Sequence, residues 1–220
     1  MQNAAGGVER WQVGHRISPG FGVAMSGALC PPGPLRARDA CRYPDWPVDR
    51  INVIGTSCSG KSTLARALAA RLGVPYVELD ALHWGPDWTP VPTATFAKRV
   101  RAATAEERWV VDGGYSAVRP ITWARADTVV WLDYPLPIIL SRWAHRTVAR
   151  IRSGAEFSAG TGNRESLRRA LGRESLLWWI LRTHRARRRR LASSLRARPD
   201  LRVVRLRSPR EATSWLRTLA

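Results

Sequence analysis

The chain has 220 residues, of which 45% are hydrophobic and 24% are charged, and its formal net charge at pH 7 is +19. This length suits one α/β domain with its own core and is short for two domains. No window of about 18 residues is apolar and uncharged throughout, so a membrane span is not expected, and the positive charge favours polyanionic partners such as nucleotides or nucleic acid. The three cysteines, Cys30, Cys41 and Cys58, fit no metal or disulfide framework, so we expect a cytoplasmic protein.

Residues 1–48 form the first region of the chain. They contain repeated glycine and proline, as in "SPGFG", "CPPGP" and "YPDWP", without helical or strand periodicity and without the pattern of an export signal. We therefore expect a poorly ordered N-terminal extension, within which Met25 is an alternative start. The folded domain is expected to span residues 49–220.

A strand, a loop and a helix begin this domain. "RINVIG", residues 50–55, is a short apolar run that ends in glycine, and "GKSTLARALAARLG" follows with leucines at helical spacing and a stop at Gly73. Strands are then expected at 75–80, up to Asp112, at 127–135 and at 201–206. Helices are expected at 93–107, after residue 135, before residue 198 and after Ser208. This alternation predicts a parallel sheet with helices on both faces.

The segment from Gly55 to Ser62 matches G-x-x-x-x-G-K-[ST] between a predicted strand and a predicted helix. In such a loop the backbone N–H groups and the helix N-terminus bind phosphate. Lys61 would reach the β- and γ-phosphates of ATP, and the Ser62 hydroxyl would bind Mg²⁺. Cys58 is either a redox-sensitive thiol or a small residue that the loop accommodates. The residues expected to bind ATP are Gly55, Thr56, Ser57, Cys58, Ser59, Gly60, Lys61, Ser62 and Thr63.

Two carboxylates stand where predicted strands end, and a parallel sheet binds ligands there. In "WVVDGG", Asp112 would hold a Mg²⁺-bound water or polarise the acceptor, or it belongs to an ordinary Asp-Gly turn. In "LDALHW", Asp80 would accept a proton from a substrate hydroxyl or contact the metal, or it caps a helix. His83 would contact the substrate, and Trp84 or Trp88 would stack on a planar substrate or pack in the core.

Arginines supply the remaining candidates. Guanidinium groups stabilise the charge that spreads over phosphoryl oxygens during transfer. Arg142 and Arg146 are four residues apart on one face of a predicted helix and are expected to contact ATP. Arg119 and Arg125 are expected to bind an anionic group of the acceptor. For each of these residues the alternative is a solvated surface arginine.

Most of the positive charge lies in residues 142–198, which hold sixteen arginines against three glutamates. The run "RTHRARRRR", residues 182–190, has two interpretations. It is typical of a helix that follows the phosphates of a nucleic acid. The apolar stretch "SLLWWIL" just before it favours instead an arginine-rich lid, here about residues 151–190, that closes over ATP, or a solvated helix.

The segments "VIGTSCSGKSTLARALA", "LDALHW", "WVVDGGYS", "RADTVVWLDYP", "NRES" and "LRVVRLRSP" resemble the adenylate-kinase-like P-loop NTPases known as DNA topology modulation proteins, over residues 50–210. The resemblance implies a nucleoside-monophosphate-kinase-like fold with a five-stranded parallel sheet and an arginine-rich lid. It also implies a metal-associated carboxylate at Asp112, ATP-contacting arginines at Arg142 and Arg146, and a substrate or metal carboxylate at Asp80. The chain departs from adenylate kinases in "DGGYSAVR", which lacks their Pro-Arg pair, and this speaks against AMP as the acceptor.

The sequence therefore predicts a cytoplasmic, Mg²⁺- and ATP-dependent P-loop kinase that transfers the γ-phosphoryl group to a small molecule, nucleotide-like or hydroxyl-bearing. Two alternatives stay open. One is a nucleic-acid-associated regulator in which ATP switches the basic helix, and the other is a slow ATPase without an acceptor. The sequence predicts neither the acceptor nor the oligomeric state.

Overall fold

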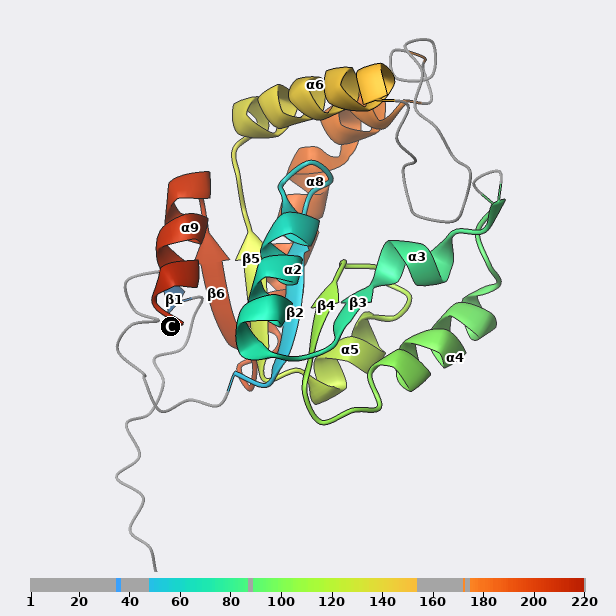
Figure 1. The fold of residues 1–220 in the computed structure, drawn as a ribbon, viewed down its shortest axis with the longest axis vertical. Coiled ribbons are helices and arrows are strands. Elements are labelled where there is room, and N and C mark those ends of the chain that lie inside the picture. The colour runs from blue at the N-terminus through green and yellow to red at the C-terminus, as the bar shows by residue number, and fades with distance from the viewer. Residues whose placement is uncertain (1–34, 37–47, 87–88, 154–171, 173–174, 220) are drawn as a thin grey trace, which may run out of the picture. The chain divides into compact units, whose positions relative to one another are not determined.

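The computed structural model describes residues 35–36, 48–86, 89–153, 172 and 175–219. Its strands are β1 (Leu35–Arg36), β2 (Arg50–Gly55), β3 (Tyr76–Glu78), β4 (Trp109–Asp112), β5 (Thr128–Leu132) and β6 (Arg202–Leu206) (Figure 1). Its helices are α2 (Lys61–Leu72), α3 (Leu79–His83), α4 (Thr93–Ala103), α5 (Arg119–Arg125), α6 (Leu136–Ser153), α8 (Leu176–Arg196) and α9 (Pro209–Arg217).

The strands form a single parallel sheet in the order β1-β6-β5-β2-β4-β3. The five strands from β2 to β6 confirm the predicted α/β sheet. A sixth, β1, pairs Leu35 and Arg36 with the edge of β6, inside the predicted N-terminal extension. The sequence did not indicate β1, because two residues joined to a sheet edge by backbone hydrogen bonds leave no side-chain pattern. Apart from these two residues and Val48, the extension lies outside the described residues.

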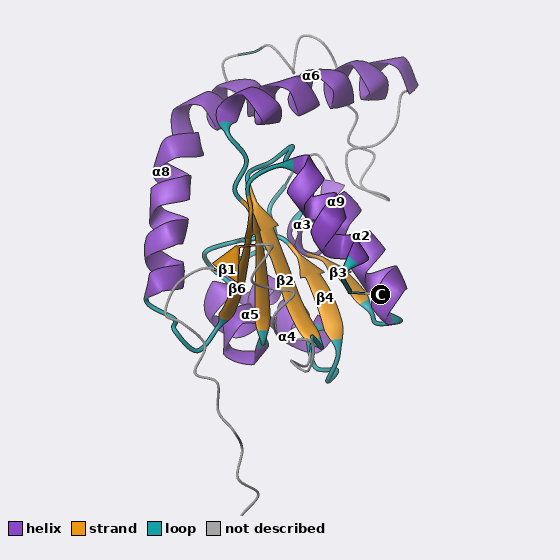
Figure 2. Ribbon diagram, turned by 90° about the vertical axis from the view of Figure 1, so that its left-hand side faces the viewer, coloured by secondary structure: helices purple, strands orange, loops and turns teal. Residues whose placement is uncertain are grey.

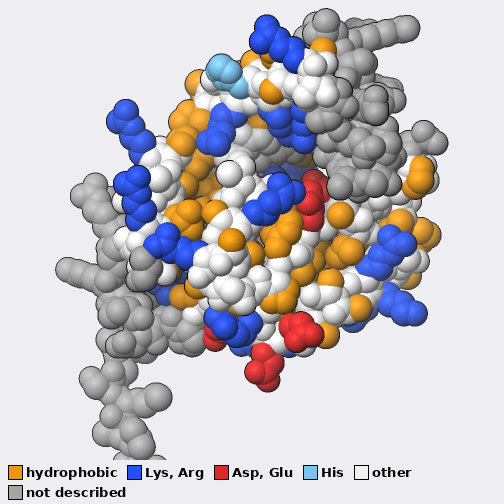
Figure 3. Space-filling view, in the orientation of Figure 1, with side chains coloured by type: hydrophobic (Ala, Val, Ile, Leu, Met, Phe, Trp, Pro, Cys, Tyr) orange, Lys and Arg blue, Asp and Glu red, His pale blue; other side chains and the backbone are white. Residues whose placement is uncertain are grey.

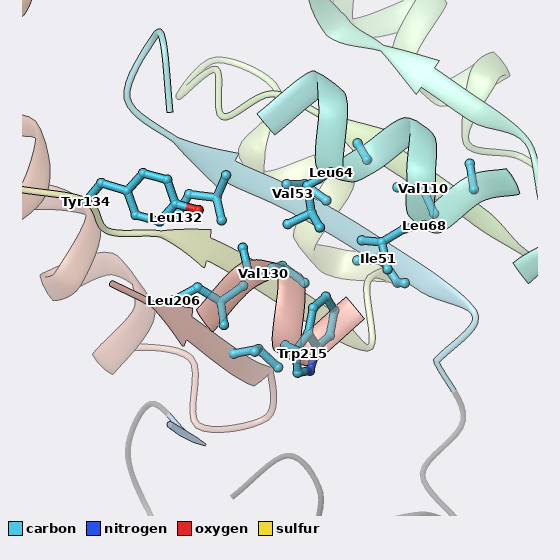
Figure 4. Packing of buried hydrophobic residues seen from close by; sticks show 14 of the residues in the cluster. Ile51, Val53, Leu64, Leu68, Val110, Val130, Leu132, Tyr134, Leu206 and Trp215 are labelled. Carbon is cyan, nitrogen blue, oxygen red and sulfur yellow. The ribbon is translucent and has the colours of Figure 1, made fainter. Parts of the chain in front are cut away.

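Helices cover both faces of the sheet (Figure 2). α2 and α9 pack on one face. Side chains of a strand alternate between the two faces, and this face carries apolar strand residues that the two helices bury: Ile51, Val53, Val130 and Leu206. Leu68 of α2 and Trp215 of α9 meet these side chains in the larger core cluster (Figure 4). α4, α5 and α8 cover the opposite face. The prediction of helices on both faces is thus confirmed.

A buried asparagine organises the second face. Asn52 of β2 is 1% exposed, and its Nδ2 donates to the carbonyl oxygens of Val111 and Gly113 at 3.2 and 2.9 Å. Its Oδ1 accepts a hydrogen bond from Trp123 Nε1 of α5 at 3.0 Å. Buried amides are stable when all their groups are paired in this way. The network therefore fixes α5 and the end of β4 against the central strand.

Two elements differ from the predictions. The strand expected at 75–80 ends at Glu78, so Asp80 lies in the first turn of α3 and not at a strand end. α5 was not predicted, because seven residues make only about two turns and show little periodicity. Gly113 makes this arrangement possible: its φ is +131°, and a Cβ there would lie 2.9 Å from Leu79 Cβ, so α3 packs directly on the backbone after β4.

The predicted lid, about residues 151–190, is described at its two ends. α6 ends at Ser153, and most of the arginine-rich part belongs to α8, whose Ile180, His184 and Leu195 are buried against the rest of the fold. The part between the two helices, except Gly172 and Ser175, lies outside the described residues. Within the described residues, no helix combines the length and apolar character that crossing a membrane requires.

Candidate functional site

The site forms where the chain changes direction across the sheet. After β2 the chain moves to β3 and β4 on one side, and it then returns to β5 and β6 on the other. In parallel sheets such a switch opens a crevice at the carboxyl ends of the strands, because the two connections leave in opposite directions. Here the phosphate loop follows β2. Asp112 is the last residue of β4 and Asp133 directly follows β5, and these two strands flank β2. α6 crosses above this edge (Figures 1 and 2).

The phosphate loop joins β2 to α2 as predicted. Gly60 is the N-cap of α2 with φ +89°, a conformation that glycine adopts without a steric penalty. A Cβ at this position would lie 3.0 Å from Arg142 Nη2 of α6, so the guanidinium group lies directly against the loop backbone. Lys61 begins α2 and is half-buried. The loop backbone, the start of α2 at Lys61 and the Arg142 guanidinium group of α6 therefore meet at the N-terminus of α2.

The two predicted ATP-contacting arginines lie on α6. Arg142 approaches the loop and has its Cζ 5.9 Å from the centre of the Tyr134 ring. Arg146 is half-buried one turn further along α6. On the face shown in Figure 3 the surface is hollowed between α6 and α2, and basic side chains gather beside the hollow. Arg142 therefore lies at the loop, while the contact of Arg146 with ATP stays a prediction.

Asp112 lies beside the loop strand. It is 4% exposed and stands opposite Val53, two residues before the loop begins. Its Oδ2 accepts a hydrogen bond from Tyr76 at 3.2 Å, and burial together with the Asp112 charge raises the pKa of Tyr76, so the phenol stays a donor. Within the described residues, Asp112 Oδ1 and the buried Ser59 Oγ have no hydrogen-bond partner. Such buried oxygens suit a water, ion or ligand group.

A second carboxylate, Asp80, accepts a hydrogen bond of 2.6 Å from the Tyr115 hydroxyl. Burial raises the pKa of Tyr115, and the nearby Asp80 charge raises it further, so Tyr115 remains protonated and orients the carboxylate. His83 stacks within 5 Å of Trp84, Phe96 and Tyr115, with ring centres 4.7, 4.8 and 4.7 Å apart. Burial lowers the pKa of His83, which favours the neutral ring. Trp88 lies outside the described residues.

Arg119 and Arg125 have different places. Arg119, at the start of α5, donates to Ser194 Oγ of α8 at 3.2 Å. Desolvation lowers its pKa and so does the positive charge of Arg187, which also acts on Tyr115. Arg119, Tyr115 and Arg187 are therefore neighbours, and Tyr115 links them to Asp80.

Arg125 is a correction to the sequence prediction. It lies in the last turn of α5, and its guanidinium group donates to the carbonyl oxygens of Thr104 and Glu106, the latter at 3.2 Å. Thr104 and Glu106 precede β4, and Arg125 precedes β5, so these bonds lie at the amino edge of the sheet. That edge is opposite the phosphate loop, and Arg125 is a structural residue there.

Sequence reasoning missed four residues of this region. Tyr115 donates to Asp80, and Arg187 acts electrostatically on Tyr115 and Arg119. His184 Nδ1 lies 3.4 Å from Thr56 Oγ1 in the phosphate loop. Asp133 is buried and bonded to Arg188 and Arg205. Only Asp133 had a signal, because "VVWLD" places it after a strand just as "WVVD" places Asp112. The partners of the other three are 35 residues or more away in the sequence, beyond the reach of local patterns.

No protein-family model matches the chain. A shikimate kinase from Synechococcus elongatus is 31% identical over 104 residues, which are 41% of this chain and 55% of that protein. The uncharacterized protein YqaC from Bacillus subtilis is 30% identical over 112 residues, 50% of this chain and 62% of that protein. The structural match to the crystal structure of a shikimate kinase from Aquifex aeolicus covers 76% of this chain and 91% of that kinase chain, at 16% identity and a TM-score of 0.46.

The chain spans somewhat more than half the length of the curated relatives that it matches. Together with the sheet and the phosphate loop, these relatives support a P-loop kinase-like protein. The resemblance to DNA topology modulation proteins stays a prediction.

Proposed function

We propose that this protein is a P-loop kinase that transfers the γ-phosphoryl group of ATP to a small molecule. The observation that carries the proposal is the meeting of two half-sites at one sheet edge. The phosphate loop with Arg142 forms the donor half, and Asp80, Tyr115, Arg119 and Arg187 form the acceptor half. Positioning and electrostatics supply most of the rate in phosphoryl transfer, and both halves provide them. The similarity to shikimate kinases supports the same class of reaction.

The donor half fits ATP and Mg²⁺. The Ser62 hydroxyl and the Asp112 carboxylate would hold the metal, directly or through water, and the unpartnered Asp112 Oδ1 supports this assignment. Mg²⁺, when bound there, would supply positive charge that neutralises the phosphates. Lys61 would bind the β- and γ-phosphates, and Arg142 would stabilise the charge that develops on the transferred group.

The acceptor half suggests a hydroxyl compound with an anionic group. Asp80, oriented by Tyr115, would accept a hydrogen bond from the attacking hydroxyl and take its proton. Arg119 and Arg187 are close enough that one charge lowers the pKa of the other. An anion bound between them would relieve this repulsion and gain charge-assisted hydrogen bonds. A carboxylate or phosphate on the acceptor meets this requirement, as in hydroxy acids and sugar phosphates.

An acceptor screen tests the proposal. Purified protein with Mg²⁺ and ATP is incubated with hydroxy acids including shikimate, sugars, sugar phosphates, nucleosides and nucleoside monophosphates, and ADP release is measured. The Lys61→Ala protein is the blank. We expect saturable stimulation by an anionic hydroxyl compound. Hydrolysis that no acceptor stimulates would instead favour a slow ATPase.

A second candidate function, nucleic-acid binding that ATP regulates, has one observation in its favour. Arg182, Arg185, Arg189 and Arg190 of α8 are exposed, and none of them forms an ion pair with another described residue. Arg188, by contrast, is bonded to Asp133. Titration of duplex DNA at increasing salt distinguishes the functions. Affinity that falls steeply with salt and is lost in an Arg185→Glu, Arg189→Glu protein would favour nucleic-acid binding.

A further inference from the structure

Within one turn, α8 carries a residue that contacts the phosphate loop and an arginine whose charge acts on the proposed acceptor half. His184 Nδ1 lies 3.4 Å from Thr56 Oγ1 in the phosphate loop. Arg187, three residues later, acts electrostatically on Tyr115 and Arg119. Three residues span less than one turn of a rigid helix, so neither contact can shift alone. A displacement of α8 therefore changes the donor half and the acceptor half together.

A buried carboxylate attaches α8 to the sheet. Asp133 directly follows β5 and is 4% exposed. Arg188 donates to it through Nε at 2.5 Å and through Nη2 at 2.9 Å. Arg205 of β6 donates from Nε at 2.8 Å and lies over the Trp131 ring at 4.6 Å. Asp133 follows β5 and Arg205 lies in β6, so both belong to the sheet. Arg188 is therefore the residue through which α8 bonds to Asp133.

The geometry of this attachment is more exact than that of the apolar contacts. The buried apolar anchors of α8, Ile180 and Leu195, are fifteen residues apart, roughly 22 Å along the helix, and between them Leu191 and Ala192 are partly buried against the core. Hydrophobic burial has no preferred direction, whereas a guanidinium group that makes two hydrogen bonds to one carboxylate is fixed in direction and distance. Arg188 is next to Arg187 and one turn after His184, so fixing Arg188 also fixes these two residues.

We propose that Asp133 and Arg188 are a positioning pair for the phosphoryl-transfer site. The pair sets the register of α8 so that His184 supports Thr56 while Arg187 faces the acceptor. The inference rests on the proposed kinase function, since it assigns the pair an effect on that site. Both residues act through His184 and Arg187 and are not catalytic residues.

The test compares two neighbouring arginines. Arg188→Gln removes the paired hydrogen bonds and leaves Asp133 bonded to Arg205, so the buried carboxylate keeps a partner. Arg189→Gln makes the same change of charge one residue later, at an exposed position. The dissociation constant for Mg·ADP is measured by calorimetry, beside the thermal unfolding of each protein. We expect Arg188→Gln to weaken ADP binding about tenfold and Arg189→Gln to leave it within about twofold.

Two further measurements separate positioning from simple destabilisation. Arg188→Lys restores the charge without the two-pronged bond, so it is expected to recover part of the affinity. With an acceptor from the screen, Arg188→Gln should raise the KM of ATP and of the acceptor together, while His184→Gln should raise that of ATP alone. If Arg188→Gln does not fold, Arg188→Lys and Arg189→Lys carry the same comparison.

The outcomes are distinguishable. A wild-type protein that binds Mg·ADP, with equal dissociation constants for the Arg188→Gln and Arg189→Gln proteins, would overturn the positioning pair and leave the kinase proposal intact. A wild-type protein that does not bind Mg·ADP would overturn the kinase proposal and, with it, the pair.

Discussion

The proposed donor and acceptor halves of the site are built in different ways. The donor half is a continuous segment, Gly55–Thr63, between the central strand and its helix. The acceptor half gathers Asp80, Tyr115, Arg119 and Arg187 from separate segments of the chain. Backbone N–H groups can make a phosphate site wherever one loop has the right conformation. An acceptor pocket needs several side chains at set distances, so it depends on how the elements pack.

The largest effect is expected in the donor half. Lys61→Ala removes the ammonium group expected at the β- and γ-phosphates, and ATP turnover should fall by about a hundredfold or more. Lys98→Ala, at the chain's other lysine, is exposed on α4 and should behave as wild type. A coupled assay of ADP release measures both. Similar turnover in the two variants would show that the loop does not bind the triphosphate as proposed.

A smaller effect, confined to the acceptor half, is expected for Tyr115→Phe. The substitution removes the 2.6 Å hydrogen bond that orients Asp80. Hydrogen bonds to charged groups contribute about 1.5–3 kcal/mol, so kcat/KM for the acceptor should fall by at least about tenfold. Calorimetry with Mg·ADP should give the wild-type affinity. Weakened ADP binding would mean that the two halves are not separable at Tyr115.

The arginines of α5 sharpen the comparison further. Arg119→Gln should raise the KM of an anionic acceptor by about fivefold, since one of two guanidinium groups is lost. Arg125→Gln should leave that KM unchanged and lower the free energy of unfolding by about 1 kcal/mol, because its partners are the carbonyl oxygens of Thr104 and Glu106. Steady-state kinetics and urea unfolding measure the two effects. A raised acceptor KM in the Arg125→Gln protein, with an unchanged KM in the Arg119→Gln protein, would contradict the placement of Arg125 at the amino edge of the sheet.

The smallest effect concerns pH. Burial lowers the pKa of both His83 in the acceptor half and His184 beside the donor half, and for His184 the charges of Arg188 and Arg185 add to this effect while Asp133 opposes it. Below the ordinary histidine pKa of 6.5 the unfolded chain binds protons that the folded protein does not. The free energy of unfolding should therefore decrease as pH falls through 6.5 and level off about one pH unit above it.

Urea unfolding between pH 5 and pH 7.5, in wild type and in the His184→Gln protein, measures this dependence. The variant should lose about half of the slope below pH 6.5, because one of the two histidines no longer titrates. An unchanged slope would show that His184 is not held in its neutral form.

The strand endings show how far sequence reasoning reached. "RINVIG" and "WVVDGG" predicted β2 and β4 within a residue or two, because buried central strands are continuous apolar runs. "PYVELD" predicted a strand up to Asp80, but α3 begins at Leu79 because Gly113 lets it pack closely on the backbone after β4. That contact joins residues 34 positions apart, and local propensity cannot indicate it.

The arginines of residues 182–190 also show what composition alone does not predict. Their composition favoured a lid or a solvated helix over a nucleic-acid contact, but it did not assign the individual arginines. The structure separates them by direction, since Arg188 reaches the buried Asp133 while Arg185 and Arg189 point to solvent. A helix turns by about 100° per residue, so neighbouring arginines in one run meet different surroundings.

The sequence by itself determined the phosphate loop, the alternation of strands and helices and the excess of positive charge, because each depends on neighbouring residues. Only the tertiary structure placed the Tyr115 hydroxyl on Asp80 and Arg119 against α8. It also placed Arg125 at the opposite edge of the sheet and Arg188 of α8 on Asp133. These pairings join distant segments through packing and buried charge, which no local pattern encodes.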